Sequence, residues 1–275
     1  MEFLLALIVV FLHGIPGSNG LWTVSRLTAK AGGSVTIPCH YHKMFRNHDK
    51  YWCKGKGWST CIVLGGTNTR QRRANMTVTD DPTELVMTAT MSNLKTTETN
   101  RYWCAVKIGG FMKPDVRTSL ELTVTDDLPD LSAANSMLSA QQGGNVSVQC
   151  LYHNKMKYKE KKWCRSGDLH SCRSLDDLEP PQHGSLQISD DENGTFTVTV
   201  GGLEREDMGW YWCMAGDVQY PVHITSSKLD HSFDCFFYPV SFDDINRRFL
   251  EVVSTEEDEL NAKPDDITLF CIVTF

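Results

Sequence analysis

Short segments of alternating apolar and polar residues recur along the chain and predict β-strands. Val35, Ile37 and Cys39 alternate with polar or proline positions, and residues 120–124 and 196–200 show the same alternation. A period of two places the apolar side chains on one face of a strand. Turn residues separate the segments, and no long amphipathic helix pattern competes with them. The pattern therefore predicts an all-β fold built from sandwiches of antiparallel sheets.

Eight of the cysteines form two matched sets and indicate an internal repeat. Three cysteines of the first set precede their counterparts in the second set by the same number of residues, and the fourth differs from this spacing by only two positions. The repeat predicts two tandem modules, residues 21–125 and 131–225, joined by a polar, proline-bearing linker at 126–130. The two sets are Cys39, Cys53, Cys61 and Cys104, and Cys150, Cys164, Cys172 and Cys213.

The spacing of cysteine and tryptophan indicates which kind of β-sandwich each module forms. The first and last cysteines of each set enclose a long segment, and a Trp stands near the beginning of that segment in both modules. This spacing matches the immunoglobulin sandwich, in which a Trp packs on an inter-sheet disulfide and a Tyr forms a corner two residues before the second Cys. The predicted core groups are Trp52, Tyr102 and the Cys39–Cys104 bridge, and Trp163, Tyr211 and the Cys150–Cys213 bridge.

A second bridge in each module follows from strand geometry. Cys53 directly follows the inward Trp52, so its side chain points to the outer face of the sheet. Cys61 lies eight residues further on, which suits the neighbouring hairpin strand. The predicted outer bridges are Cys53–Cys61 and Cys164–Cys172.

Two further tryptophans, Trp103 and Trp212, alternate with inward residues and are expected on the same outer face. Each either covers the neighbouring disulfide or forms a contact face. In the second case the chain would be a homotypic adhesion module, which is one alternative function.

The motifs around these cysteines carry a family resemblance. They are KYWCK at 50–54, CIVL at 61–64, RANMT at 73–77 and RYWC at 101–104. With them the chain resembles the polymeric immunoglobulin receptor-like family, which includes CMRF-like leukocyte receptors, and most of all its short, fish-type members with two modules. The resemblance covers about residues 22–225. It implies V-type immunoglobulin domains, each with two disulfides, in a type I membrane receptor with an immune function.

The resemblance also implies where a ligand binds. Members of the family bind polymeric immunoglobulin, or anionic lipids, through loops at one end of the first domain. Here these loops are residues 42–49 and 107–117, in which cations alternate with apolar residues as an interface with an acidic rim and an apolar centre requires. The expected contact residues are Lys43, Phe45, Arg46, Lys50, Phe111 and Met112.

Two kinds of accessory feature are expected. In V-type domains an Arg of strand D pairs with an acid near the corner Tyr, which implies a salt bridge between Arg73 and Glu98 in the first module only. The sequence also contains three N-x-[ST] acceptors for N-linked glycans. They are Asn75, Asn145 and Asn193, of which Asn145 is expected to be poorly accessible within a strand.

The beginning of the chain indicates secretion. Residues 3–12 form a ten-residue apolar run followed by small and helix-breaking residues. Such a run is too short to span a bilayer but suits a signal peptide, here residues 1–20. A secreted protein with ten cysteines is expected to be disulfide-bonded in an extracellular, oxidising environment.

Charge is divided unevenly between the parts of the chain. Residues 21–125 hold 15 Lys and Arg against 7 Asp and Glu, a balance of +8, whereas residues 126–225 hold 8 against 15, a balance of −7. A basic first module either meets an acidic partner surface or complements the second module.

Motifs of the commoner enzyme classes are absent from the sequence. It lacks C-x-x-C, G-x-G-x-x-G, G-x-x-x-x-G-K-[ST], H-E-x-x-H and G-x-S-x-G. The pair His40 and His42 has no third ligand at a fitting spacing. We therefore expect no catalysis, no metal or other cofactor and no nucleic-acid partner.

The acidic tail at 226–275 departs from the family pattern. Its longest apolar run is nine residues, 267–275, against the roughly 20 needed to cross a bilayer. No transmembrane helix is expected in the tail, which indicates a secreted form or an alternative C-terminus in place of the family's membrane anchor. Cys235 and Cys271 are left to pair with each other or with a second chain.

The sequence thus favours a non-catalytic immune receptor ectodomain that binds polymeric immunoglobulin through the loops of its first domain, with signalling or transport implied by the family. A receptor or soluble decoy for anionic lipids is the first alternative, and homotypic adhesion is the second.

Overall fold

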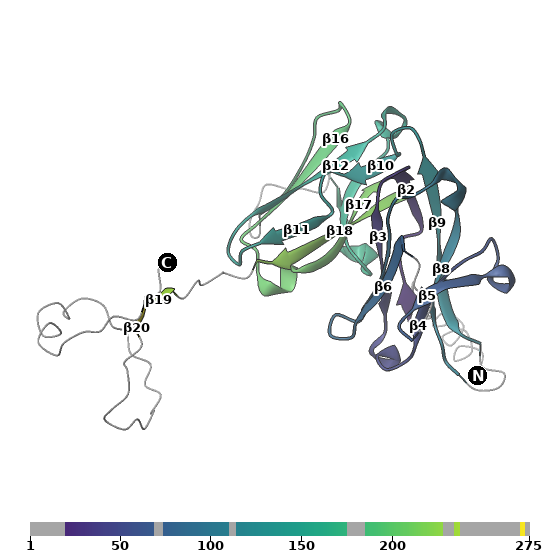
Figure 1. Cartoon of the computed structure of the whole chain (residues 1–275). Coiled ribbons are helices and arrows are strands. Elements are labelled where there is room, and N and C mark those ends of the chain that lie inside the picture. The colour runs from purple at the N-terminus through teal and green to yellow at the C-terminus, as the bar shows by residue number, and fades with distance from the viewer. Residues whose placement is uncertain are drawn as a thin grey trace, which may run out of the picture. The chain divides into compact units, whose positions relative to one another are not determined.

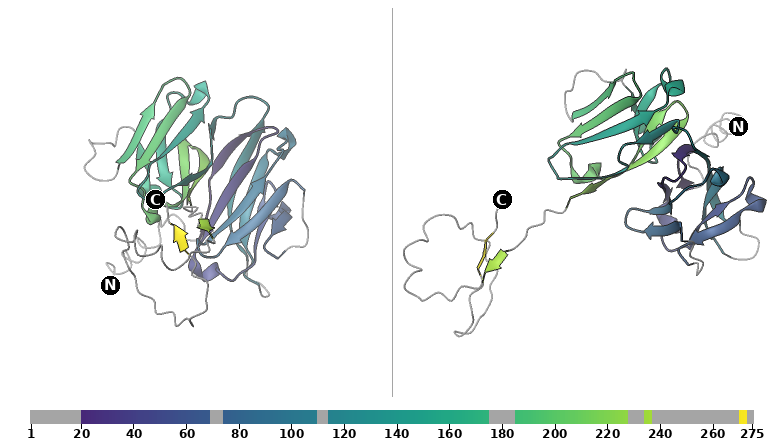
Figure 2. Two further views of the ribbon diagram at one scale, coloured as in Figure 1. Left: turned by 60° about the vertical axis from the view of Figure 1, so that its left-hand side comes forward. Right: turned by 45° about the horizontal axis from the view of Figure 1, so that its top comes forward.

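A computed structural model describes residues 20–68, 74–109, 114–174, 185–227, 234–236 and 270–272. Within them, two β-sandwich modules follow one another along the chain (Figure 1). Each consists of two sheets packed face to face, which Figure 2 shows in two further views. The prediction of an all-β chain with two tandem immunoglobulin-type sandwiches is confirmed.

The first module pairs its strands in the orders β1-β3-β7-β6 and β2-β9-β8-β4-β5. Neighbouring strands are antiparallel except β2 and β9, which run parallel from Arg26↔Glu121 to Lys30↔Thr125. The strands are β1 (Leu21–Trp22), β2 (Arg26–Lys30), β3 (Val35–Tyr41), β4 (Lys50–Lys54), β5 (Ile62–Gly66), β6 (Met76–Asp81), β7 (Val86–Met91), β8 (Asn100–Val106) and β9 (Val116–Thr125). Short 3-10 helices are η1 (Lys43–Phe45), η2 (Trp58–Thr60) and η3 (Thr96–Glu98).

The second module repeats this topology with the orders β10-β12-β16-β15 and β11-β18-β17-β13-β14. Its parallel pair is β11 and β18. The strands are β10 (Leu131–Ala133), β11 (Met137–Ala140), β12 (Val146–Tyr152), β13 (Lys161–Arg165), β14 (Arg173–Ser174), β15 (Ser185–Asp190), β16 (Thr195–Gly201), β17 (Gly209–Ala215) and β18 (Val218–Ser226). Its 3-10 helices are η4 (Asn154–Met156), η5 (Leu169–Ser171) and η7 (Arg205–Asp207).

The core of each module forms around the residues that the cysteine spacing singles out. Trp52 and Tyr102 are fully buried, and their rings stack with centroids 5.3 Å apart. Trp163 and Tyr211 repeat the arrangement at 4.9 Å. The long bridges Cys39–Cys104 and Cys150–Cys213 join the two sheets of each sandwich.

A corner tyrosine closes one end of each module. The Tyr102 hydroxyl donates to the backbone oxygen of Glu98 at 2.7 Å, and Tyr211 donates in the same way to Asp207 at 2.7 Å. This is the hydrogen bond expected of a tyrosine corner. It ties the 3-10 helix before strand β8 or β17 to the core.

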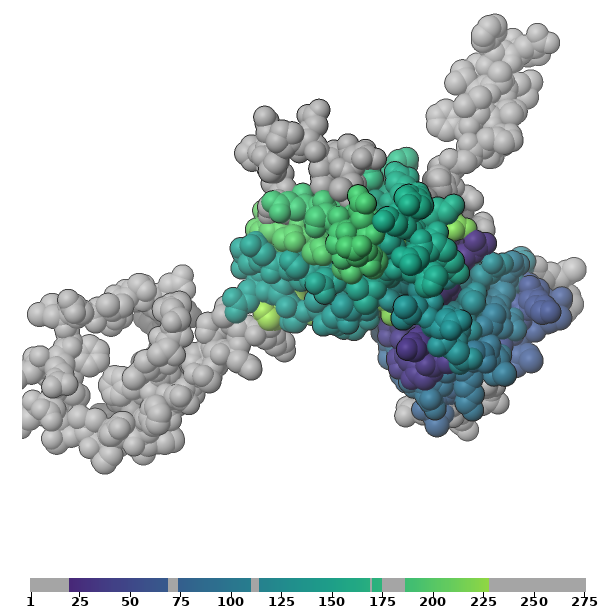
Figure 3. Space-filling model, turned by 90° about the horizontal axis from the view of Figure 1, so that it is seen from above, coloured from purple at the N-terminus to yellow at the C-terminus, as the bar shows by residue number. Residues whose placement is uncertain are grey.

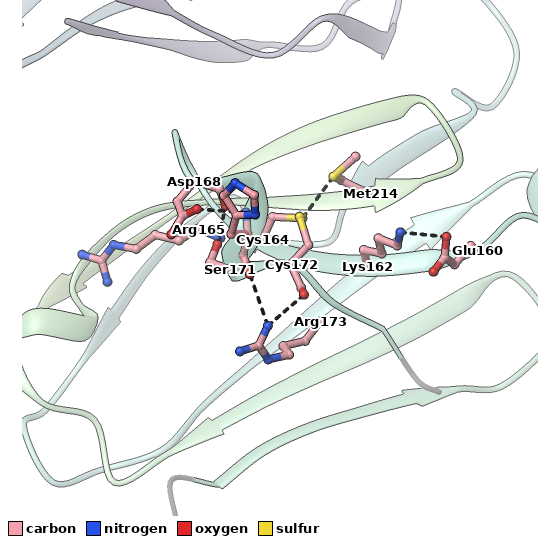
Figure 4. Close-up of a disulfide and its surroundings, with 10 residues drawn as sticks. Glu160, Lys162, Cys164, Arg165, Asp168, Ser171, Cys172, Arg173 and Met214 are labelled. Atoms are coloured by element: carbon pink, nitrogen blue, oxygen red, sulfur yellow. Dashed lines mark hydrogen bonds and ion pairs between the residues drawn. A yellow bond between two sulfur atoms is a disulfide. The ribbon is translucent and has the colours of Figure 1, made fainter. Parts of the chain in front are cut away.

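The short bridges Cys53–Cys61 and Cys164–Cys172 join residues eight positions apart, as predicted. In the first module the bridge links β4 to the residue that precedes β5. Figure 4 shows the second, where Met214 Sδ lies 3.1 Å from Cys164 Sγ. Beside this bridge, Lys162 forms an ion pair with Glu160 at 2.8 Å.

The two modules belong to one structural unit, and they contact each other along β2, β3, β10 and β18. Ser25 N donates to Gln219 Oε1 at 2.6 Å, and Thr28 Oγ1 donates to Leu131 O at 3.2 Å. His40 Nε2 lies 2.7 Å from Ser166 Oγ. Figure 3 shows the surfaces of the two modules in contact.

Residues 228–275 form a separate unit. Its described strands, β19 (Asp234–Phe236) and β20 (Phe270–Ile272), pair antiparallel with the backbone of Cys235 opposite that of Cys271. None of the helices in the described part of the chain is long and apolar enough to cross a membrane. The predicted signal peptide lies outside the described residues except for Gly20.

Candidate ligand-binding loops of the first module

The 42–49 loop turns sharply through η1, and this turn decides which of its side chains face outward. The His42 ring accepts a hydrogen bond from Met44 N at 3.4 Å and caps the 3-10 helix. Phe45 then points inward and is only 5% exposed, whereas Met44 is 65% exposed. Lys43 and Arg46 on either side are exposed as well. The outer surface of the loop therefore presents one apolar side chain between two cations.

Lys50 follows the loop at the start of β4 and is buried, with 2% of its side chain exposed. Its ammonium group donates to Arg46 O and His48 O, both at 3.0 Å, and to Asp80 Oδ2 at 2.9 Å. The cation also lies 4.2 Å from the centre of the Tyr41 ring. Lys50 thus joins the loop to β3 and β6.

The Asp80 carboxylate completes this arrangement. Its Oδ1 accepts from the Tyr41 hydroxyl at 2.8 Å while its Oδ2 accepts from Lys50. Burial, and then the hydrogen bond to Asp80, raise the pKa of Tyr41, so the phenol stays protonated and donates. Both carboxylate oxygens are therefore satisfied.

A surface hollow of about 350 Å³ lies between Asp49 at the end of the 42–49 loop and the residues Lys107 and Asp115. Lys107 N donates to Asp49 O at 2.8 Å and holds the two segments together. The Asp115 carboxylate accepts from the Tyr51 hydroxyl at 2.6 Å and from Ile108 N at 3.2 Å. The residues lining the hollow are Asp49, Lys50, Tyr51, Val63, Asn68, Lys107 and Asp115.

Two of the expected contact residues have a different role. Phe45 packs in the core, and the ammonium group of Lys50 is hydrogen-bonded within the module, so neither side chain faces a partner. Lys43 and Arg46 are exposed as expected, although Arg46 Nε donates to Pro82 O at 2.8 Å. Phe111 and Met112 lie outside the described residues.

Met44 is the exposed apolar residue that the sequence analysis missed, and the internal repeat carries the signal that identifies it. When the two modules are aligned on their cysteines, the position equivalent to Phe45 is Met156, which is 6% exposed. An apolar residue at that position in both modules indicates the core. Met44 instead aligns with Lys155, a residue that faces solvent.

The outer face of the first module carries an aromatic cluster beside the short disulfide. Trp103 is partly buried, pairs in register with Cys53, and donates through Nε1 to Gly55 O at 2.9 Å. Trp58 lies edge-on to it at 5.7 Å, and the Arg117 guanidinium stacks over Trp58 at 4.5 Å. Trp103 therefore packs within this cluster. Its counterpart Trp212 is buried.

Glu98 and the glycan acceptors can be placed, while Arg73 lies outside the described residues. Glu98 accepts from Lys95 N at 2.8 Å and from the Asn75 amide at 3.4 Å. Asn145 immediately precedes β12 and is exposed, so the expected poor accessibility is not found. Asn193 is also exposed, and Asn75 is half-buried.

No group of three or more His, Cys, Asp or Glu side chains in the described part of the chain is arranged to hold a metal ion. The described residues of the loops offer cations, an apolar side chain and a polar hollow for non-covalent recognition.

Comparison with known proteins places both modules in one family. The immunoglobulin V-set domain matches residues 23–125 and 134–230. The mouse polymeric immunoglobulin receptor is 29% identical over 189 residues, which is 66% of this chain and 24% of that receptor. Human CMRF35-like molecule 7 is 27% identical over 156 residues, covering 56% of this chain and 73% of that protein.

A solved structure is also similar in sequence. The crystal structure of a teleost fish polymeric immunoglobulin receptor ectodomain is 40% identical, covering 75% of this chain and 98% of that chain, with a TM-score of 0.36. The chain spans about a quarter of the length of the mammalian polymeric immunoglobulin receptors that it matches.

Proposed function

The chain belongs to the immunoglobulin V-set domain family, and from this premise we propose that its first module binds polymeric immunoglobulin. Its relatives are receptors built from immunoglobulin domains, so the chain is a receptor-type ectodomain and not an enzyme. The proposal concerns the ligand and the loops that contact it.

The observation that carries the proposal is the exposure of Lys43, Met44 and Arg46 together on the outer surface of the 42–49 loop. An apolar anchor flanked by cations fits a protein surface with acidic groups around an apolar centre. The module carries an excess of 8 positive charges, which would steer an acidic partner toward it. Lys107 adds a further exposed cation at the edge of the hollow.

Anionic lipid is a second candidate ligand, and Met44 is the observation that favours it. An apolar side chain between cations also suits insertion into the boundary region of an anionic membrane. We further propose an extracellular site of action, on a cell surface or in secreted form, with glycans at the exposed Asn145 and Asn193. Signalling or transport after ligand binding is part of the same proposal.

The test measures binding of the full chain to immobilised polymeric immunoglobulin by surface plasmon resonance. Monomeric immunoglobulin and phosphatidylserine vesicles serve as the other two surfaces. The double variant Lys43→Glu/Arg46→Glu should lose at least about tenfold in affinity, because two attractive charges become repulsive.

A matched control makes the same charge change elsewhere on the first module. Lys56→Glu/Lys95→Glu alters two exposed lysines outside the 42–49 loop and should bind like the unmodified chain. Equal binding by both double variants would refute the loop as the contact surface. Binding to phosphatidylserine vesicles but not to polymeric immunoglobulin would select the lipid candidate.

A further inference from the structure

A buried constellation of lysine, aspartate and tyrosine occurs in both modules. In the first it consists of Lys50, Asp80 and Tyr41, described above. The second module repeats each partner at the equivalent position of the internal repeat, to within one place along the chain. The repeated set is Lys161, Asp190 and Tyr152.

The contacts repeat as well as the residues. Lys161 is buried, its ammonium group lies 3.4 Å from Asp190 Oδ2, and it is 4.2 Å from the centre of the Tyr152 ring. Tyr152 donates its hydroxyl proton to Asp190 Oδ1 at 2.6 Å. Burial and this hydrogen bond raise the pKa of Tyr152 to about 12. The same charge arrangement therefore occurs twice, beneath loops that differ in sequence.

Both lysines also donate to the backbone of the loop that precedes them. Lys50 donates to Arg46 O and His48 O, and Lys161 donates to Lys157 O at 2.5 Å. A lysine ammonium has three N–H donors. In the first module two go to loop carbonyls and one to Asp80, so the cation is fully bonded although it is buried.

Each of these bonds constrains a different part of the 42–49 loop. The Arg46 carbonyl belongs to the C-cap residue of η1, and the His48 carbonyl lies two residues further on. Lys43 and Arg46 carry like charges within one short turn, and their repulsion favours a more open loop. A buried cation held by Asp80 opposes this opening by bonding the carbonyls on the inner side.

We propose that Lys50 is a positioning residue for ligand binding, whose ammonium group, anchored on Asp80, clamps the backbone of the 42–49 loop and sets the positions of Lys43, Met44 and Arg46. This inference rests on the proposed function for its effect on ligand. A clamped loop loses less conformational entropy when it meets a partner, so the clamp increases affinity without touching the ligand.

The test compares equivalent neutral pairs in the two modules of the full chain. Lys50→Met/Asp80→Asn removes the clamp but leaves no unpaired buried charge, and the Asn oxygen still accepts from Tyr41. Lys161→Met/Asp190→Asn makes the matching change in the second module. Both double variants should melt within a few degrees of the unmodified chain.

Amide hydrogen exchange then separates loop positioning from general stability. In Lys50→Met/Asp80→Asn, the amides of Arg46 and His48 should exchange about tenfold faster or more, because their backbone bonds to Lys43 O and Phe45 O open without the clamp, while amides in β8 keep their protection. Affinity for polymeric immunoglobulin should fall by about tenfold. The second-module variant should show neither change.

The proposal would be overturned if loop amides of Lys50→Met/Asp80→Asn exchanged at the rate of the unmodified chain. It would also be overturned if they exchanged faster but the variant kept the unmodified chain's affinity for polymeric immunoglobulin. Failure of that variant to fold while its counterpart folds would overturn it too, because the group would then serve the fold of the module. If the unmodified chain binds no polymeric immunoglobulin, the proposed function fails. Amide hydrogen exchange in the 42–49 loop still decides whether Lys50 is the clamp.

Discussion

Met44 and Phe45 are neighbours whose side chains lie on opposite sides of the same turn. The 3-10 helix η1 directs Phe45 into the core and leaves Met44 in solvent. Residue type alone ranks Phe45 as the better contact residue because aromatic side chains are enriched at interfaces. The backbone turn reverses that ranking, since it fixes the direction in which each side chain points.

Replacing these two residues should therefore have opposite consequences. Phe45→Ala should lower the free energy of unfolding by about 3 kcal/mol, because it leaves a cavity in the core. Met44→Ala should change that free energy by less than about 0.5 kcal/mol and reduce affinity for the ligand of the loop. Urea unfolding and surface plasmon resonance measure the two effects. A large loss of stability in Met44→Ala would contradict the assignment of the turn.

At the scale of the strands, the two kinds of disulfide constrain the chain to different degrees. The 39–104 bridge connects β3 of one sheet to β8 of the other, whereas the 53–61 bridge closes a loop beside a single hairpin. In the chain-entropy account, a bridge stabilises by limiting the unfolded chain, and the effect grows with the length of the closed loop. The long bridge is therefore the stronger constraint on the fold.

Removing the bridges separately should reveal this difference. Cys53→Ser/Cys61→Ser opens only a short loop and should cost about 2.5 kcal/mol, while Cys39→Ala/Cys104→Ala should cost about 4 kcal/mol or prevent folding. Chemical denaturation followed by tryptophan fluorescence measures both. Equal losses would mean that native packing around the short bridge matters more than loop length.

At the scale of the whole molecule, His40 reports on the contact between the modules. Its ring stacks on Trp22 at 5.8 Å and its Nε2 meets Ser166 of the second module. Burial lowers the pKa of His40 the most, and the nearby His223 and Arg165 lower it further, so that it falls from 6.5 to about 4. Burial also lowers the pKa of His223, against the opposing effect of Asp81. The packed state thus requires His40 to be neutral.

The contact between the modules should consequently weaken in acid. Above pH 6.5 His40 is neutral in both packed and unpacked states, so its stabilising contribution is complete. Between pH 6.5 and pH 4 only the unpacked state binds the proton, and up to roughly 3 kcal/mol of stability is lost. Small-angle scattering and thermal unfolding across this range measure the change. His40→Gln should remove most of this dependence of stability on pH. If the variant kept the pH profile of the unmodified chain, groups other than His40 would be responsible for the loss of stability in acid.

Patterning and spacing alone determined the fold and the disulfides of this protein. Strand periodicity, the repeat of four cysteines and the position of Trp52 were sufficient because they reflect local geometry and one widely shared packing arrangement. The candidate contacts in the loops of the first module came from the family resemblance, because patterning and spacing do not indicate where a ligand binds.

Only the tertiary structure decided which loop side chains are available to a ligand. Lys50 looks like a surface cation in the sequence, but its burial depends on Asp80, a residue 30 positions away on another strand. His40 likewise meets Ser166 across 126 residues. Charge and exposure at these positions depend on contacts between distant segments, and no local pattern of residues encodes such contacts.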